Sequence, residues 1–102
     1  MTQPVTSKEE LALTIDVAEW QWIRPHLERD ALVVVAPGLE LAEAGWRIAT
    51  DDTAAVSAWI REGELGKPDA GRIERWNATP ARLFSVLIVS PYILIQERPD
   101  IL

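Results

Sequence analysis

In residues 7–24, apolar side chains recur at helical spacing among polar ones. Ser7 and Glu10 have the spacing of a capping box, in which a serine begins a helix and an acidic residue three positions later bonds back to it. Pro25 then interrupts the pattern, because a proline ring clashes with the preceding helical turn. The sequence therefore predicts a first helix over residues 7–24.

Three later segments consist of aliphatic and β-branched residues, which are typical of strands. They cover residues 31–36, 83–89 and 92–96. Their apolar residues are consecutive rather than alternating, so we expect both faces of the resulting sheet to be covered. Ser90-Pro91 separates the last two segments and predicts either a hairpin turn or a bend in one strand.

Helical patterns over residues 39–50, 52–62 and 69–77 complete the predicted elements. Asp51 or Asp52 precedes the second of them and Asp69 the third, each as an N-cap, and Gly63 follows the second at the position where a glycine commonly ends a helix. The predicted fold is α+β, with a small, mostly antiparallel three-stranded sheet and about four helices. The 102 residues fit a single domain, 1–102, in which 1–6 and 98–102 are loose ends.

The predicted first helix has apolar side chains on two opposite sides. At about 100° per residue, Leu11 and Trp22 fall on one stripe, whereas Leu13, Val17 and Trp20 fall on the other. A helix on the surface of a monomer needs only one such stripe. We therefore expect that this helix either lies between layers of its own chain or contacts a protein partner. A homo-oligomer is one such arrangement, since two-fold dimers are the commonest assembly.

Tryptophan is unusually frequent, with five residues in the chain. Trp22, Trp59 and Trp76 fit the inward stripes of their helices and are predicted core residues, whereas Trp20 and Trp46 do not. Tryptophan beside arginine is typical of interface hot spots; alternatively, Trp46 packs beneath a loop or the C-terminal tail. The interface candidates are Leu13, Val17, Trp20, Trp46 and Arg47.

The formal net charge is −6, from sixteen acidic and ten basic residues. Without a basic run, this argues against direct binding of nucleic acid, which depends on Lys and Arg. The apolar runs are too short to span a membrane, and residues 1–10 do not have the pattern of a signal peptide. Together with the absence of cysteine, these features predict a cytoplasmic protein that does not enter a membrane.

Motifs for catalysis or for cofactor binding are absent from the sequence. His26 is the single histidine, and the glycines are scattered rather than gathered in a phosphate loop. The sequence therefore favours a non-catalytic protein without a cofactor, and no catalytic, cofactor-binding or metal residue is predicted. One alternative is a small-molecule or divalent-metal site built from Asp51 and Asp52 with Glu40, Glu43 or Arg47, although helix capping explains the aspartates more simply. Another is an acidic inhibitor of a nucleic-acid-binding protein.

The order of several short motifs is also informative. Leu39-Glu40-Leu41 enters a helix after the first strand, Ile48-Ala49-Thr50-Asp51-Asp52 follows it, and Val89–Glu97 closes the chain. From about Glu10 to Glu97 the sequence resembles the bacterial domain of unknown function 2288 family, with Glu40 in place of an expected aspartate. This resemblance implies a compact intracellular domain and carries no activity to any residue. The function favoured by the sequence is a non-catalytic protein-interaction or regulatory module.

Overall fold

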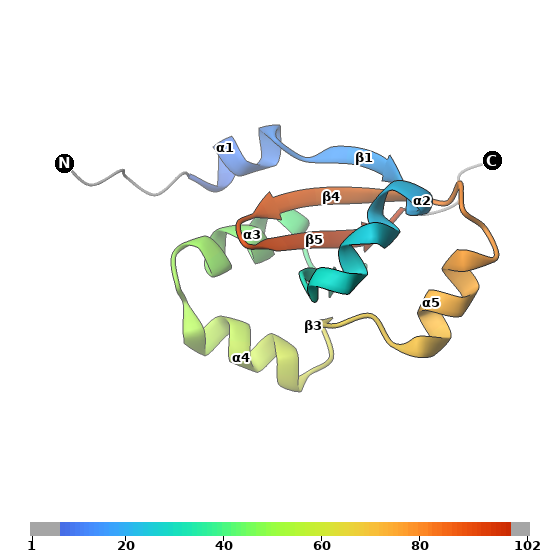
Figure 1. Cartoon of the computed structure of the whole chain (residues 1–102). Helices are drawn as coiled ribbons and strands as arrows, with labels where there is room; N and C mark the ends of the chain where they lie inside the picture. The colour runs from blue at the N-terminus through green and yellow to red at the C-terminus, as the bar shows by residue number, and fades with distance from the viewer. Residues whose placement is uncertain (1–6, 99–102) are drawn as a thin grey trace.

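The structure, a computed structural model, describes residues 7–98 (Figure 1). Within this range the chain forms five α-helices, one 3₁₀ helix and a five-stranded mixed sheet. In chain order the elements are α1 (Lys8–Leu13), β1 (Asp16–Glu19), α2 (Trp20–Ile23), η1 (Arg24–Arg29), β2 (Leu32–Val35), α3 (Leu41–Ala49), α4 (Thr53–Arg61), β3 (Leu65–Gly66), α5 (Ala70–Asn77), β4 (Leu83–Val89) and β5 (Tyr92–Glu97). None of these helices is long and apolar enough to cross a membrane.

The three predicted strands are confirmed, but they form only the centre of a larger sheet. Its order is β1-β4-β5-β2-β3. β4 and β5 form an antiparallel hairpin around Ser90-Pro91, so the hairpin is the correct alternative. β2 is parallel to β5, with Leu32 opposite Ile93, whereas the other three neighbouring strand pairs are antiparallel. The sheet is therefore mixed, although most of its pairs are antiparallel as predicted. The three predicted strands do not include the short edge strands β1 and β3.

The prediction of one helix over residues 7–24 is wrong. Its start is confirmed, because Ser7 and Glu10 form the expected capping box, but α1 ends at Leu13. The chain then becomes the edge strand β1, with Asp16 opposite Val86, before α2 begins at Trp20. The two apolar stripes thus arise because the segment changes from helix to strand, and side chains alternate between faces in a strand. They do not belong to one sandwiched helix.

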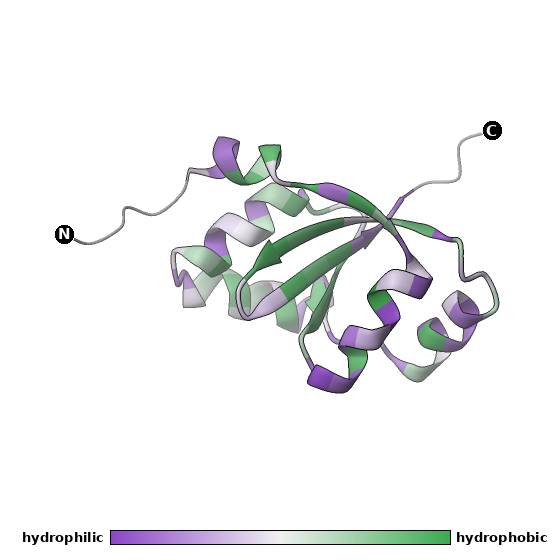
Figure 2. Cartoon of the chain, turned by 45° about the horizontal axis from the view of Figure 1, so that its top comes forward, coloured by the Kyte–Doolittle hydropathy of each residue, from purple (hydrophilic) through white to green (hydrophobic). Residues whose placement is uncertain are grey.

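One face of the sheet, here called the α3 face, is covered by α1, α3 and α4. Its buried core contains Leu11, Val35, Leu41, Ala44, Leu65, Leu87 and Leu94. Gly45 lets α3 approach β4 closely, since a Cβ atom at this position would lie 2.4 Å from Leu87 Cδ2. Figure 2 shows the apolar central strands between helices whose polar residues lie on the outer sides.

The opposite face, here called the α5 face, is covered by α2, η1 and α5. Trp20, Trp76 and Phe84 meet there, with ring centroids 4.9 Å apart for the two tryptophans and 5.0 Å for Trp76 and Phe84. The Trp20 indole N–H donates to Asn77 Oδ1 at 2.8 Å. Helices thus cover both faces of the sheet, as the uninterrupted apolar strands predicted.

The structure reverses the predicted roles of two tryptophans. Trp20, an interface candidate, is 1% exposed, whereas Trp22, a predicted core residue, is 68% exposed. The helical wheel failed because Trp20 follows a strand and starts a new helix, so its direction is set by β1 rather than by Leu11. In this conformation Trp20 is not accessible to a partner.

These two tryptophans provide a matched pair for testing the fold. We expect Trp20→Ala to lower the free energy of unfolding by about 3–5 kcal/mol, because it empties a site filled by a large buried side chain. Trp22→Ala should change it by less than about 0.5 kcal/mol, since its side chain is exposed. Urea denaturation measures both, and a larger loss for Trp22→Ala would contradict the structure.

Candidate functional site

β1 is one of the two edge strands of the sheet, and its outer edge lies beside exposed apolar side chains. Within residues 7–98, β1 pairs with β4 alone, and nothing lies above its outer edge in Figure 1. Directly after β1, the Trp20 N–H donates to Arg82 O at 2.8 Å, which shows that Trp20 bonds toward the chain that forms β4. Because inward and outward backbone groups alternate along an antiparallel strand, Asp16 and Ala18 bond toward β4, and the N–H and C=O of Val17 and Glu19 point outward.

Exposed apolar side chains lie on both sides of this edge. Leu13 at the end of α1 is 86% exposed and Val17 is 45% exposed. On β4, Leu83 is 46% and Ile88 is 65% exposed. The strand register places Val17 and Leu83 on the α3 face, and Ile88 on the α5 face just beyond the β1–β4 pairing. These four residues, with the outward backbone of β1, are called the β1 edge surface.

The two remaining interface candidates lie elsewhere. Trp46 is half-buried against the core of the α3 face. The Arg47 guanidinium lies over its ring, 5.0 Å from the centroid, in cation–π geometry. Leu13 and Val17 therefore belong to the β1 edge surface, whereas Trp46 and Arg47 are part of α3, which packs on the α3 face of the sheet.

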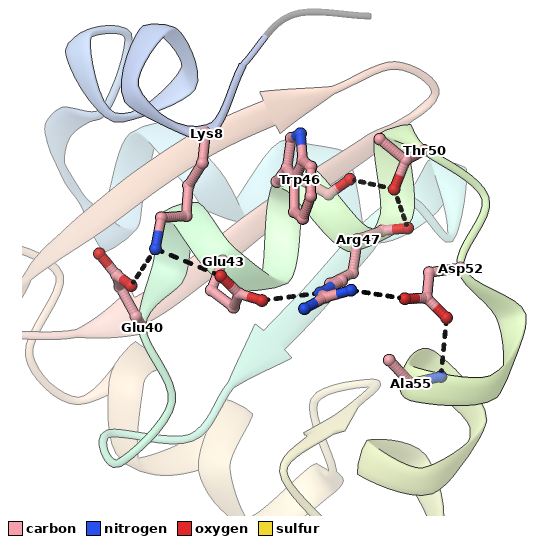
Figure 3. Close-up of polar contacts among 8 residues, drawn as sticks. All are labelled: Lys8, Glu40, Glu43, Trp46, Arg47, Thr50, Asp52 and Ala55. Carbon is pink, nitrogen blue, oxygen red and sulfur yellow. Dashed lines mark hydrogen bonds and ion pairs between the residues drawn. The ribbon is translucent and has the colours of Figure 1, made fainter.

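Arg47 also forms part of a network of charges that joins three helices (Figure 3). Its Nε donates to Glu43 at 2.7 Å and its Nη1 to Asp52 at 2.8 Å. Lys8 on α1 lies 3.3 Å from carboxylate oxygens of both Glu40 and Glu43. The network thereby connects α1 to α3 and α3 to the start of α4.

The partners of Glu43 and Asp52 stabilise the charged forms of both carboxylates. Arg47, helped by Lys8, lowers the pKa of Glu43 below its ordinary value. The Ala55 backbone N–H, which donates to Asp52 at 3.1 Å, lowers the pKa of Asp52, and Arg47 lowers it further. Both groups are therefore ionised at neutral pH, where they hold the helices together.

Three of the four carboxylates considered for a metal site are engaged in structural contacts. Asp52 caps α4, and Glu40 and Glu43 form the ion pairs described above. Asp51 occupies the turn between α3 and α4 with a φ of 62°, a conformation that aspartate tolerates better than most residues. No group of three or more potential ligands that could hold a metal ion occurs among residues 7–98. The helix-capping explanation therefore accounts for Asp52.

A family model described as "Protein of unknown function (DUF2288)" matches residues 6–97. The chain belongs to this family. The resemblance seen over Glu10–Glu97 is thus confirmed, and the description of the DUF2288 family names no activity.

A solved structure supports the fold of this DUF2288 chain. It is similar to the NMR solution structure of PA1075 from Pseudomonas aeruginosa, with a TM-score of 0.77 and 30% sequence identity. The match covers 88% of this chain and 82% of that one. A search of curated proteins gave no significant match.

Of the β1 edge surface in this DUF2288 chain, Leu13 and Val17 were interface candidates from the sequence, whereas Leu83 and Ile88 were not. Both lie in the predicted strand 83–89, where every apolar residue was expected to be covered. Their exposure depends on the extent of the helices above each face, which strand composition does not reveal. One available signal was the β-branched pair Ile15 and Val17 around Asp16, which favours a strand over a helix.

The network around Arg47 predicts a specific pH dependence. A carboxylate whose pKa is lower in the folded state stabilises the fold above its unfolded pKa, and this contribution is lost as the pH falls through the folded pKa. We therefore expect Arg47→Gln to destabilise the protein at neutral pH and the deficit to shrink below about pH 4, where Glu43 and Asp52 become protonated. Urea denaturation over this pH range measures the effect.

Arg61→Gln is the control, because it removes the same charge from an exposed position without a bonding partner among residues 7–98. The explanation would be contradicted if the loss of unfolding free energy in Arg47→Gln stayed constant down to pH values at which both carboxylates are protonated.

Proposed function

We propose that the protein is a non-catalytic interaction module whose contact surface is the β1 edge surface. The observation that carries the proposal is the combination of outward backbone groups on Val17 and Glu19 with exposed Leu13, Leu83 and Ile88 around them. An extended partner segment adds to such an edge through main-chain hydrogen bonds, while its side chains contact the apolar residues on either face.

The register supports contacts on both faces of the added strand. Val17 lies opposite Ser85, diagonally across from Leu83, so the two exposed side chains are close enough on the α3 face to contact one partner residue. Ile88 has half-buried Ile93 opposite it on the α5 face. Covering these groups removes apolar area from water, which is the main source of affinity at such contacts.

Acidic groups on the edge favour a basic partner strand. Asp16 Oδ1 accepts the Val17 N–H at 2.8 Å, and Asp16 itself is exposed. A partner must displace this carboxylate to bond with Val17, and a Lys or Arg opposite it would compensate for the lost contact. An acidic edge also limits unspecific pairing between strands.

Two kinds of partner suit this surface: a second copy of the chain and a different protein. Of the alternatives from the sequence, the small-molecule or divalent-metal site near Asp51 and Asp52 has less to support it, because Glu43 and Asp52 already serve as ion-pair and cap residues. The acidic inhibitor stays a prediction and would use the same acidic edge.

Val17→Lys tests the proposal, because it places a charge at the centre of the β1 edge surface. If the partner is a second copy, the wild type should elute as a dimer in size-exclusion chromatography with light scattering, and Val17→Lys as a monomer. If the partner is another protein, immobilised wild type should retain from extract a defined protein that Val17→Lys does not retain.

Ile60→Lys is the matched control, since Ile60 is also exposed and apolar but lies on α4. It should behave as the wild type in both assays. The proposal would be refuted if the wild type were a monomer and retained from extract the same proteins as Val17→Lys. It would also be refuted if Val17→Lys and Ile60→Lys lost dimerisation or partner binding to the same extent.

A further inference from the structure

A cleft of about 400 Å³ lies between β2, β3 and α5, next to the end of β5. Since the sheet order begins with β1 and ends with β3, this cleft and the β1 edge surface are on opposite sides of the molecule. Its volume falls within the range of small-molecule sites. The cleft is therefore independent of the proposed interaction surface.

The cleft occupies a position in the sheet that suits a ligand. β2 and β5 are parallel, and their carboxyl ends meet there: Ala36 and Pro37 follow β2, and Glu97 ends β5. Ligands of open α/β sheets commonly bind just beyond the carboxyl ends of parallel strands, where loops diverge and leave a crevice. The same arrangement occurs here between the only two parallel strands of residues 7–98.

Basic residues gather at this cleft although the chain is acidic. Lys67, Arg72 and Arg75 line it, which is three of the ten Lys and Arg residues in a chain of net charge −6. Arg72 and Arg75 are three positions apart on α5, a spacing that places them on the same side of a helix. The cleft thus concentrates positive charge within the reach of one ligand.

The partners of these cations leave them available to an anion. Among residues 7–98, Arg75 has no hydrogen-bond or ion-pair partner. Arg72 pairs with Asp69 at 3.3 Å, and Lys67 pairs with Asp30; both pairs are exposed. Exposed pairs contribute little to stability, so a multivalent anion can replace these carboxylates at small cost.

The acidic residue of the cleft does not oppose such a ligand. Glu97 is the one acidic residue in its lining, and its Oε1 lies 2.9 Å from Arg82 Nη2. Because this pair is largely covered, the Glu97 charge is compensated locally. Arg75 is then the uncompensated charge in the cleft.

From this placement we infer that the cleft binds a small molecule through an oxyanion, a phosphate or a carboxylate, held by Arg72 and Arg75 with Lys67 beside them. Guanidinium groups bind both oxyanions through paired N–H···O bonds, which a point charge does not provide. Gly66 leaves room for the ligand at the sheet edge, since a Cβ atom there would meet nothing within 4 Å.

The inference is tested by NMR titration of the ¹⁵N-labelled chain with inorganic phosphate and, separately, with acetate, with chloride keeping the ionic strength constant. Saturable shifts at the amides of Gly66, Arg72 and Arg75 are expected with at least one of the two anions. Tighter binding of phosphate would identify phosphate compounds as the ligand class, and tighter binding of acetate would identify carboxylates.

Matched variants distinguish a site from diffuse charge. Arg75→Gln should weaken binding about tenfold, which is the usual effect of losing one charge-assisted contact, and Arg72→Gln with Arg75→Gln should abolish saturation. Arg24→Gln removes the same charge from the exposed start of η1 and should leave the affinity unchanged. Shifts that chloride reproduces, no localised shift with either anion, or equal weakening by Arg24→Gln would overturn the inference.

Discussion

The packing of Trp20 and Trp76 on Phe84 is the contact on which the arrangement of the chain depends. This contact holds α2 and α5 against the α5 face of β4, the strand that contains Phe84, while α3 packs on the other face of β4. Trp20 directly follows β1, so its burial also fixes which side chains of that strand turn inward. A shift of one residue would exchange the faces of β1 and would place Asp16 and Ala18, instead of Val17 and Glu19, on the α3 face beside Leu83. The aromatic contact therefore determines the composition of the β1 edge surface.

Much of the centre of this fold follows from local sequence, and its edges do not. The strands around 32–35 and 83–97 have consecutive apolar residues that predict burial on both faces, and the caps at Ser7 and Asp69 act as expected. β1 escaped prediction because four residues with mixed polarity fit a helical wheel as well as a strand. Its identity depends on pairing with residues 83–86, a contact that is remote in sequence.

Among the candidate residues, too, the sequence predicted what depends on local spacing and failed where contacts remote in sequence decide. Leu13 and Val17 are exposed, but Trp20 is buried, since a helical wheel carried across a strand assigns the wrong direction. Arg47 was noted for its position beside Trp46. Its ion pair with Glu43 follows from the i,i+4 spacing within α3, whereas the pair with Asp52 needed the α3–α4 turn to bring the two side chains together. The basic cleft could not be predicted from the sequence, because only the fold brings Lys67 and Arg75 together at the ends of β2 and β5.

The β1 edge surface exists only if residues 16–19 form an edge strand that, among residues 7–98, pairs with β4 alone. Amide hydrogen exchange of the dilute protein, followed by NMR, tests it most directly. We expect slow exchange at the Asp16 and Ala18 amides, which bond toward β4, and fast exchange at Glu19, whose N–H points outward. Slow exchange at all four residues, as in a continuous helix, would contradict it.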